Sequence, residues 1–155
     1  MTTPYSDVYD LFITAVKDWK LDALYASSLV DFETYLQRFL IDAVARFEDV
    51  CNQSLEKNDT TSLFTETLTQ RNQLLLADLM IESWLNKEIK DIKQFNLHIL
   101  DKGDFKIYSE AQNLKAKEDS LSQVRENNSQ KISDYMWRSD DYGYLDDWIA
   151  GNFGV

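Results

Sequence analysis

The chain has 155 residues, of which 44% are hydrophobic and 13% aromatic, and it carries a net charge of −11. This length fits one domain, and a domain of this size buries roughly two thirds of its unfolded surface. The acidic charge argues against direct binding to nucleic acid, because such binding requires clustered lysine and arginine to neutralise phosphates. One proline and four glycines leave few breaks, so the composition favours long helices over a many-turned β architecture.

The single cysteine, Cys51, excludes a disulfide within the chain, and its apolar neighbours favour a buried, unreactive thiol. The first residues lack the basic and apolar regions of a signal peptide. No apolar run approaches the roughly 20 residues of a membrane span. We therefore expect a protein without membrane contact, made in a reducing compartment.

The first helix is expected over residues 4–19. Thr3 and Pro4 form a typical helix opening, a capping hydroxyl followed by proline at the first helical position. Residues 21–27 are then expected to form a short, mostly apolar connection. The predicted helix has apolar residues at spacings of three and four, namely Val8, Leu11, Phe12, Ala15, Val16 and Trp19.

A second, aromatic-rich helix is expected from residue 28 to about residue 51. Ser28 and Asp31 form a weaker relative of the capping box. A stripe of aromatic and aliphatic side chains at helical spacing is typical of a core-facing surface. The residues of this stripe are Phe32, Tyr35, Leu36, Phe39, Leu40, Ala43, Val44, Phe47 and Val50.

Residues 52–67 are polar and rich in capping residues, so they are expected to form a loop that Leu63 and Phe64 anchor to the core. A central helix is predicted over residues 68–92, with Thr69 as its N-cap. Its apolar residues cover well over half of the circumference, which requires burial on several sides. These residues are Leu74, Leu75, Ala77, Leu79, Met80, Trp84 and Leu85.

The last long helix is expected to begin after Gly103, with Asp104 as its cap. Its half between residues 115 and 130 is highly polar, and we expect that half to project into solvent or against a neighbouring subunit. The apolar side of the helix is predicted to consist of Phe105, Tyr108, Ala111, Leu114, Leu121, Val124 and Ile132.

Residues 133–155 differ in composition from the rest, with six aromatic residues, three glycines, five aspartates and one arginine. Aspartate and glycine resist burial, whereas tyrosine and tryptophan are enriched at binding hot spots. We therefore expect a helical domain over residues 1–132 and a C-terminal docking tail over 133–155 that is mobile or loosely packed until it binds a partner. The alternative is that Tyr135 and Trp137 finish the last helix against the core. The predicted partner-binding residues of the tail are Trp137, Tyr142, Tyr144, Trp148 and Phe153.

No catalytic, cofactor or metal site is predicted, and we expect a protein that is not an enzyme. His98 is the single histidine, which excludes His-pair zinc sites and two-His di-iron sites, and nothing local supports a dyad with Cys51. The acidic pairs at 140–141 and 146–147 lack the ligand spacing of a calcium loop. Glycine-rich phosphate loops and nucleophile elbows are absent from the sequence. The helical carboxylates are interpreted as a solvated stripe or as members of salt bridges: Asp78, Glu82, Glu88 and Asp91.

Three blocks of the sequence resemble a family of short, acidic, all-α proteins encoded in the virion structural modules of tailed phages and prophages of Gram-positive bacteria. The resemblance covers roughly residues 1–135 and contains no catalytic motif. The blocks are Met-Thr-Thr-Pro-Tyr-Ser-Asp-Val-Tyr-Asp-Leu-Phe at 1–12, Leu-Ala-Asp-Leu-Met-Ile-Glu-Ser-Trp-Leu at 76–85, and Asp-Lys-Gly-Asp-Phe-Lys-Ile-Tyr-Ser-Glu-Ala-Gln-Asn-Leu at 101–114.

Proteins of this kind look like head-to-tail connector subunits, also called adaptor or head-completion proteins. The resemblance implies a virion protein of the neck, made in the host cytoplasm, that forms a homo-oligomeric ring below the portal. Such a ring would join the portal to the next neck or tail protein and would let DNA pass without specific binding. The tail lies beyond the matched residues, and its docking onto the portal is expected by analogy with the terminal extensions that adaptors use, for which it has the composition. The charge of −11 supports a different hypothesis, an acidic DNA mimic that inhibits a nucleic-acid-binding protein. A minor virion protein or a cytoplasmic helper is a third.

Overall fold

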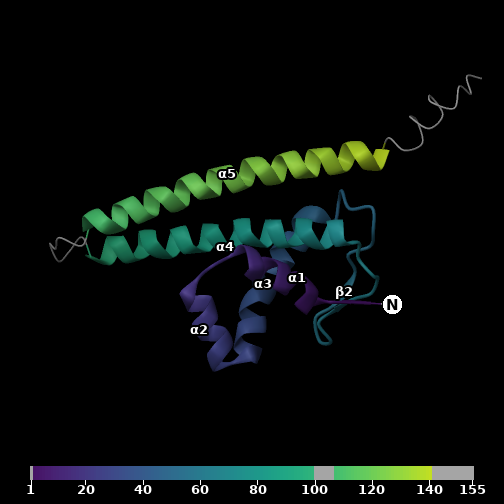
Figure 1. Cartoon of the computed structure of the whole chain (residues 1–155), viewed down its shortest axis with the longest axis horizontal. Helices are drawn as coiled ribbons and strands as arrows, with labels where there is room; N and C mark the ends of the chain where they lie inside the picture. Colours follow the sequence, from purple (N-terminus) through teal and green to yellow (C-terminus); the bar gives the residue numbers. More distant parts are fainter. Residues whose placement is uncertain (1, 100–106, 141–155) are drawn as a thin grey trace, which may run out of the picture.

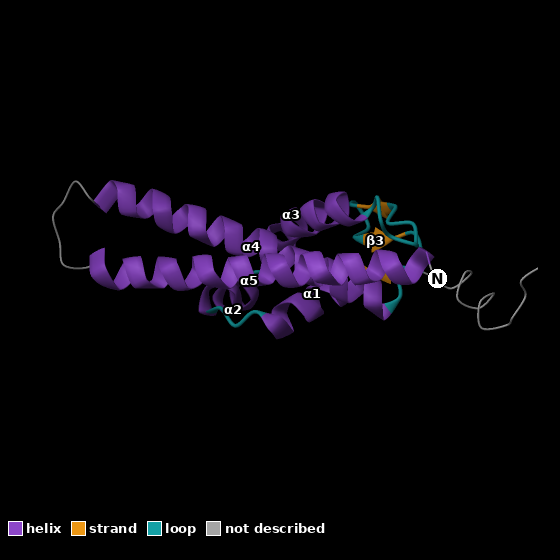
Figure 2. Cartoon of the chain, turned by 90° about the horizontal axis from the view of Figure 1, so that it is seen from above, coloured by secondary structure: helices purple, strands orange, loops and turns teal. Residues whose placement is uncertain are grey.

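The structure is a computed structural model that describes residues 2–99 and 107–140. Within these residues the helices are α1 (Tyr5–Ala15), α2 (Trp19–Ser27), α3 (Leu29–Phe47), α4 (Gln70–Ile99) and α5 (Ile107–Asp140). α4 lies between α5 on one side and the shorter helices on the other (Figure 1). α4 and α5 run antiparallel as a hairpin whose end near residue 99 projects beyond α1–α3 (Figures 1 and 2). The predicted all-α class is confirmed.

The central position of α4 is as predicted, and the helix is longer than expected, reaching Ile99. Thr69 caps it, because its Oγ1 accepts a hydrogen bond of 3.3 Å from the backbone N–H of Asn72. Leu74 was expected in the core and is 45% exposed, because the neighbouring α5 side chains are the polar Lys131, Asp134 and Arg138. The apolar residues of α4 that are buried are Leu75, Leu76, Ala77, Leu79, Met80, Trp84, Leu85 and Ile89.

The expected single helix over 4–19 is wrong, and so is the expected connection over 21–27, because α1 ends at Ala15 and a second helix begins at Trp19. Asp18 has an extended backbone, and its carboxylate accepts hydrogen bonds from the N–H groups of Lys20 at 2.7 Å and Leu21 at 3.4 Å. A carboxylate that satisfies the free N–H groups of a first turn is an N-cap. It therefore starts α2, and Trp19 becomes the first residue of that helix, 75% exposed.

Thr3 was predicted to cap the first helix, and that prediction is also wrong. Its Oγ1 accepts a hydrogen bond of 2.8 Å from the N–H of Leu68, the buried residue that leads into α4. Pro4 precedes α1 as an N-cap without a side-chain hydrogen bond. Thr3 therefore ties the start of the chain to the start of the central helix.

The second helix is confirmed, and α3 ends at Phe47. Ser28 caps it, since its Oγ accepts a hydrogen bond of 3.2 Å from the N–H of Asp31. The predicted aromatic stripe is a core face, with Tyr35 and Val50 partly buried. The buried residues of the stripe are Phe32, Leu36, Phe39, Leu40, Ala43, Val44 and Phe47.

Three strands of two residues each form a small antiparallel sheet in the order β1-β3-β2: β1 is Thr3–Pro4, β2 is Lys57–Asn58 and β3 is Leu63–Phe64. Phe64 pairs with Thr3 on one side and with Lys57 on the other. It is fully buried, and its ring centroid lies 5.1 Å from that of Tyr5, so the predicted anchoring of the loop by Phe64 is confirmed. Strands this short carry too little alternation to be predicted.

α5 packs along α4 for most of its described length. The expectation that residues 115–130 project away from the domain is therefore wrong. Leu121 and Asn128 are buried, and Leu114 and Val124 are partly buried against the core. Lys117, Glu118 and Arg125 pair with charges on α4, whereas most other polar side chains of this stretch are exposed. The predicted cap Asp104 lies outside the described residues.

Candidate functional site

The first notable site on α4 is a buried carboxylate that three helices share. Glu82 is 5% exposed. Its Oε2 accepts hydrogen bonds of 3.0 Å from Arg46 of α3 and from Asn128 of α5, and its Oε1 lies 3.3 Å from Nε of Arg125. Burial alone raises the pKa of Glu82, but the hydrogen bonds from Asn128 and Arg46 outweigh burial and hold the pKa below its usual value. Glu82 is therefore charged at neutral pH and joins α3, α4 and α5.

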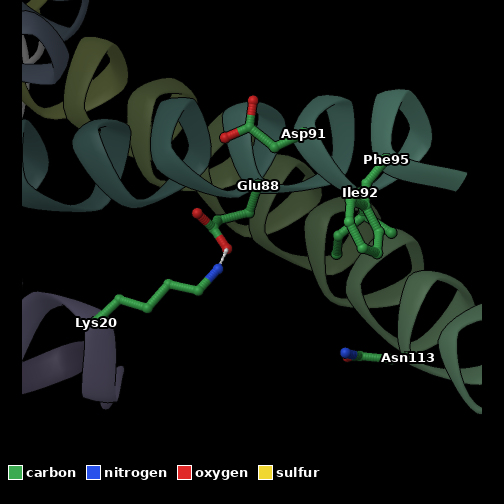
Figure 3. A pocket seen from close by; sticks show the side chains of 6 residues that line it. All are labelled: Lys20, Glu88, Asp91, Ile92, Phe95 and Asn113. Carbon is green, nitrogen blue, oxygen red and sulfur yellow. Dashed lines mark ion pairs between the residues drawn. The ribbon is translucent and has the colours of Figure 1, made fainter. Parts of the chain in front are cut away.

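A second buried carboxylate, Glu88, lies near the projecting end of the hairpin. Its Oε2 is 3.1 Å from Nζ of Lys117 on α5 and 3.7 Å from Nζ of Lys20 on α2. Lys117 also lies 5.9 Å from the ring centroid of Trp84, a cation–π distance. Figure 3 shows Glu88 pointing toward Lys20 at the edge of a hollow of about 390 Å³. The hollow is lined by Lys20, Glu88, Asp91, Ile92, Phe95 and Asn113.

The charged contacts between α4 and α5 follow the antiparallel order of the hairpin. Asp78 pairs with Lys131 at 2.5 Å, Glu82 with Arg125, and Glu88 with Lys117. The carboxylates advance along α4 while their partners recede along α5. Both buried carboxylates thus have cationic partners, an arrangement that joins helices and is not that of an unpaired catalytic acid. The sequence interpretation as salt-bridge members is confirmed for all four carboxylates, since Asp91 also pairs with Lys87, and Glu82 and Glu88 are buried rather than solvated.

Tyr135, the first aromatic residue of the predicted docking tail, belongs to the core. It is 2% exposed, and its ring centroid lies 5.1 Å from that of Phe47. Its hydroxyl donates to Oδ1 of Asn52 and accepts a hydrogen bond of 3.0 Å from the N–H of the same residue, while burial raises its pKa. Sγ of Cys51, a partly buried thiol, lies 3.8 Å from this hydroxyl. The alternative considered from the sequence therefore holds for Tyr135, because α5 continues through residue 133 to Asp140.

Trp137 lies two residues further along α5 and is 73% exposed. Of the predicted partner-binding residues it is the one whose side chain is described, and its exposure leaves the ring available for contact. The remaining predicted anchors, Tyr142, Tyr144, Trp148 and Phe153, lie outside the described residues. The single histidine, His98, falls in α4, and its side chain is also outside the description.

A third feature lies between the start of α4 and the end of α5, where a hollow of about 290 Å³ has a mostly cationic rim. Arg71, Lys131 and Arg138 contribute three positive charges against the carboxylate of Asp134. The guanidinium of Arg71 stacks over the ring of Tyr135 at 4.6 Å from the centroid. The hollow is lined by Arg71, Leu74, Leu75, Lys131, Asp134 and Arg138.

Sequence reasoning missed the partners of Glu82 and the cationic hollow. One signal was present: Asn128 continues the helical spacing of Leu121 and Val124, so a polar residue occupies a position on the buried stripe. A buried asparagine requires hydrogen-bond partners, and a carboxylate on the facing helix supplies one. No comparable signal links Arg71 to Arg138, because they are far apart in the sequence.

Comparisons with protein-family models, with curated proteins and with solved structures found no match. No helix within residues 2–99 and 107–140 is long and apolar enough to cross a membrane. In the same part of the chain no three histidine, cysteine or acidic side chains gather into a group that could hold a metal ion.

Proposed function

We propose that this protein is a structural subunit of a phage head-to-tail connector, a ring below the portal that extends the DNA channel and joins the head to the tail. The observation that carries the proposal is the family resemblance, two of whose three blocks meet in the core. Phe12 ends the first block, and its ring centroid lies 6.3 Å from that of Trp84 in the second. The resemblance thus concerns residues that build one packed unit.

The form of the subunit supports this proposal. At 1.5 Å per residue, the 34 residues of α5 extend about 50 Å. α4 and α5 project beyond the shorter helices (Figures 1 and 2), which gives an elongated subunit with surface on both sides of the hairpin. A ring requires each subunit to present two different surfaces to its two neighbours, and an elongated subunit provides them.

The distribution of charge favours a channel protein over a DNA mimic. A mimic must present unpaired carboxylates at phosphate-like spacing, but several carboxylates of α4 and α5 are paired with lysines, as in Lys87–Asp91 and Lys93–Glu118. A moderately acidic surface is suited to DNA that must slide without binding.

The inhibitor hypothesis keeps one supporting observation, the exposed carboxylates of residues 48–66. This segment carries Glu48, Asp49, Glu56, Asp59 and Glu66, all exposed, against Lys57. Pull-down from a host extract discriminates between the hypotheses, since an inhibitor would recover a nuclease or another nucleic-acid-binding protein.

Mass spectrometry of purified particles tests the connector proposal. We expect the protein to be present at a copy number comparable to that of the portal protein, and particles made without it to have filled heads that lack tails. Its absence from purified particles would refute the proposal.

The role of the tail is tested by deleting residues 138–155, a change that leaves the core contact of Tyr135 intact. We expect a folded subunit that no longer enters the particle, because the proposed portal contact is lost. Trp137→Ala should weaken incorporation, whereas Trp19→Ala, which removes an equally exposed tryptophan from α2, should not. Normal incorporation of the truncated subunit would remove the tail from the proposal.

A further inference from the structure

The cationic hollow at the end of α5 is unusual in a chain with a net charge of −11. Lys131 has an ion-pair partner in Asp78. Among the described side chains, neither Arg71 nor Arg138 forms an ion pair, and Arg71 contacts the ring of Tyr135 instead. Two guanidinium groups without carboxylate partners therefore line the same hollow.

The floor of the hollow is apolar. Leu74 remains 45% exposed there, although it lies on the helix around which the domain is built, and Leu75 is buried beside it. An exposed leucine next to two unpaired guanidinium groups suits a ligand that combines carboxylates with apolar side chains.

The chain itself contains a segment with this chemistry directly after Asp140. Residues 141–155 include Asp141, Asp146 and Asp147 and contain no lysine or arginine. The segment begins three residues after Arg138, and fifteen residues can extend about 50 Å, so it can reach the hollow. Its apolar residues are Tyr142, Tyr144, Leu145, Trp148, Ile149, Ala150, Phe153 and Val155.

We propose that in the free subunit the hollow binds the chain's own C-terminal segment, residues 141–155. The carboxylates of Asp146 and Asp147 pair with Arg71 and Arg138, and an aromatic side chain covers Leu74. This contact goes beyond the proposed connector function: it keeps the aromatic residues covered before assembly, and a portal surface that takes up the tail has to displace it. Because the contact belongs to the purified chain, its test is independent of any assay on particles.

Hydrogen–deuterium exchange of the full-length protein measures the contact. We expect amides of 141–155 to exchange about tenfold more slowly than in an unstructured peptide of the same sequence. Binding to the hollow protects them, because exchange requires the segment to be released into solvent. At 1 M salt, where the Debye length is about 3 Å, most of this protection should be lost while that of α4 remains. Unprotected amides at low salt would overturn the proposal without requiring any variant.

Charge reversal identifies the hollow as the binding site. Arg71→Glu with Arg138→Glu should remove the protection, and adding Asp146→Lys with Asp147→Lys should restore it. Lys17→Glu with Lys115→Glu changes the net charge equally at two exposed lysines and should leave the protection in place. If the quadruple variant does not regain protection while α4 is still protected, the proposed pairing of the two aspartates with the two arginines is refuted. Protection that disappears on dilution would assign the contact to a second copy and refute an intramolecular one.

Discussion

Glu82 provides the most direct test of how the helices are held together. Its carboxylate accepts hydrogen bonds from Arg46, Arg125 and Asn128, which come from the helices on both sides of α4. Glu82→Gln keeps the size of the side chain and removes the charge. Hydrogen bonds to a charged group contribute about 1.5–3 kcal/mol each when buried. The side chains of Arg46 and Arg125 are 38% and 52% exposed. In the variant, water can therefore replace part of the interaction that each guanidinium loses with the carboxylate.

We therefore expect Glu82→Gln to lower the free energy of unfolding by about 2 kcal/mol, a large share of the roughly 5–15 kcal/mol typical of a domain. Urea denaturation measures it, and an unchanged denaturant slope shows that the fold is kept. Asp91→Asn is the matched control, because it removes one negative charge from the same helix at an exposed pair with Lys87. That change should cost less than about 0.5 kcal/mol. Equal losses for the two variants would refute the reasoning.

The pH dependence of Glu82 gives the same argument a second readout. The folded protein holds the pKa of Glu82 below the value of the unfolded chain, so its ionised form contributes stability above the unfolded pKa, near 4.5. This contribution is lost as the pH falls through the lower folded pKa. Denaturation curves between pH 7 and pH 3 should show the parent losing more stability than Glu82→Gln does. An identical loss in both would contradict the assignment.

Three further predictions follow from the packing and the charge. Trp84→Ala should lower the free energy of unfolding by about 3–5 kcal/mol or prevent folding, because the side chain is buried against Phe12; a melting temperature near that of the parent would contradict this. Tyr135→Phe should cost about 1 kcal/mol and a few degrees of melting temperature, because the hydroxyl bonds to Asn52 are lost; an unchanged melting temperature would show that they contribute nothing. Duplex DNA should not be bound at physiological salt, and a salt-dependent gel shift at micromolar protein would refute this expectation.

Local sequence patterns predicted the parts of the fold that depend on residues close together in the sequence. The spacing of apolar residues and the caps Ser28 and Thr69 were sufficient for α3 and α4. The same spacing was misleading up to Trp19, because α1 ends at Ala15, where the backbone of Val16 becomes extended. Asp18 then caps a new helix, so Trp19 belongs to α2 although it continues the apolar spacing of the first helix.

Features that depend on tertiary placement could not be predicted in the same way. The exposure of Leu74 depends on which α5 residues face it, and neither helix alone specifies that. The three-helix contact of Glu82 likewise requires α3 and α5 to lie on opposite sides of α4. Asn128 came closest to being predictable, because a polar residue within an apolar stripe requires a partner.

The polar contacts between α4 and α5 have a consequence for the register of the hairpin. Apolar packing alone specifies the register of two antiparallel helices weakly, because a shift by one turn places similar side chains opposite one another. Here a shift of one turn would remove Arg125 and Asn128 from Glu82, a side chain that is 5% exposed, and would leave its carboxylate with Arg46 as its remaining partner. Removing partners from a buried charge costs several kcal/mol, whereas the paired arrangement adds little net stability over an apolar one. We therefore expect the paired carboxylates of α4 to act chiefly by making shifted arrangements unfavourable. A register specified in this way determines where the end of α5, with Trp137 and the cationic hollow, lies relative to the start of α4.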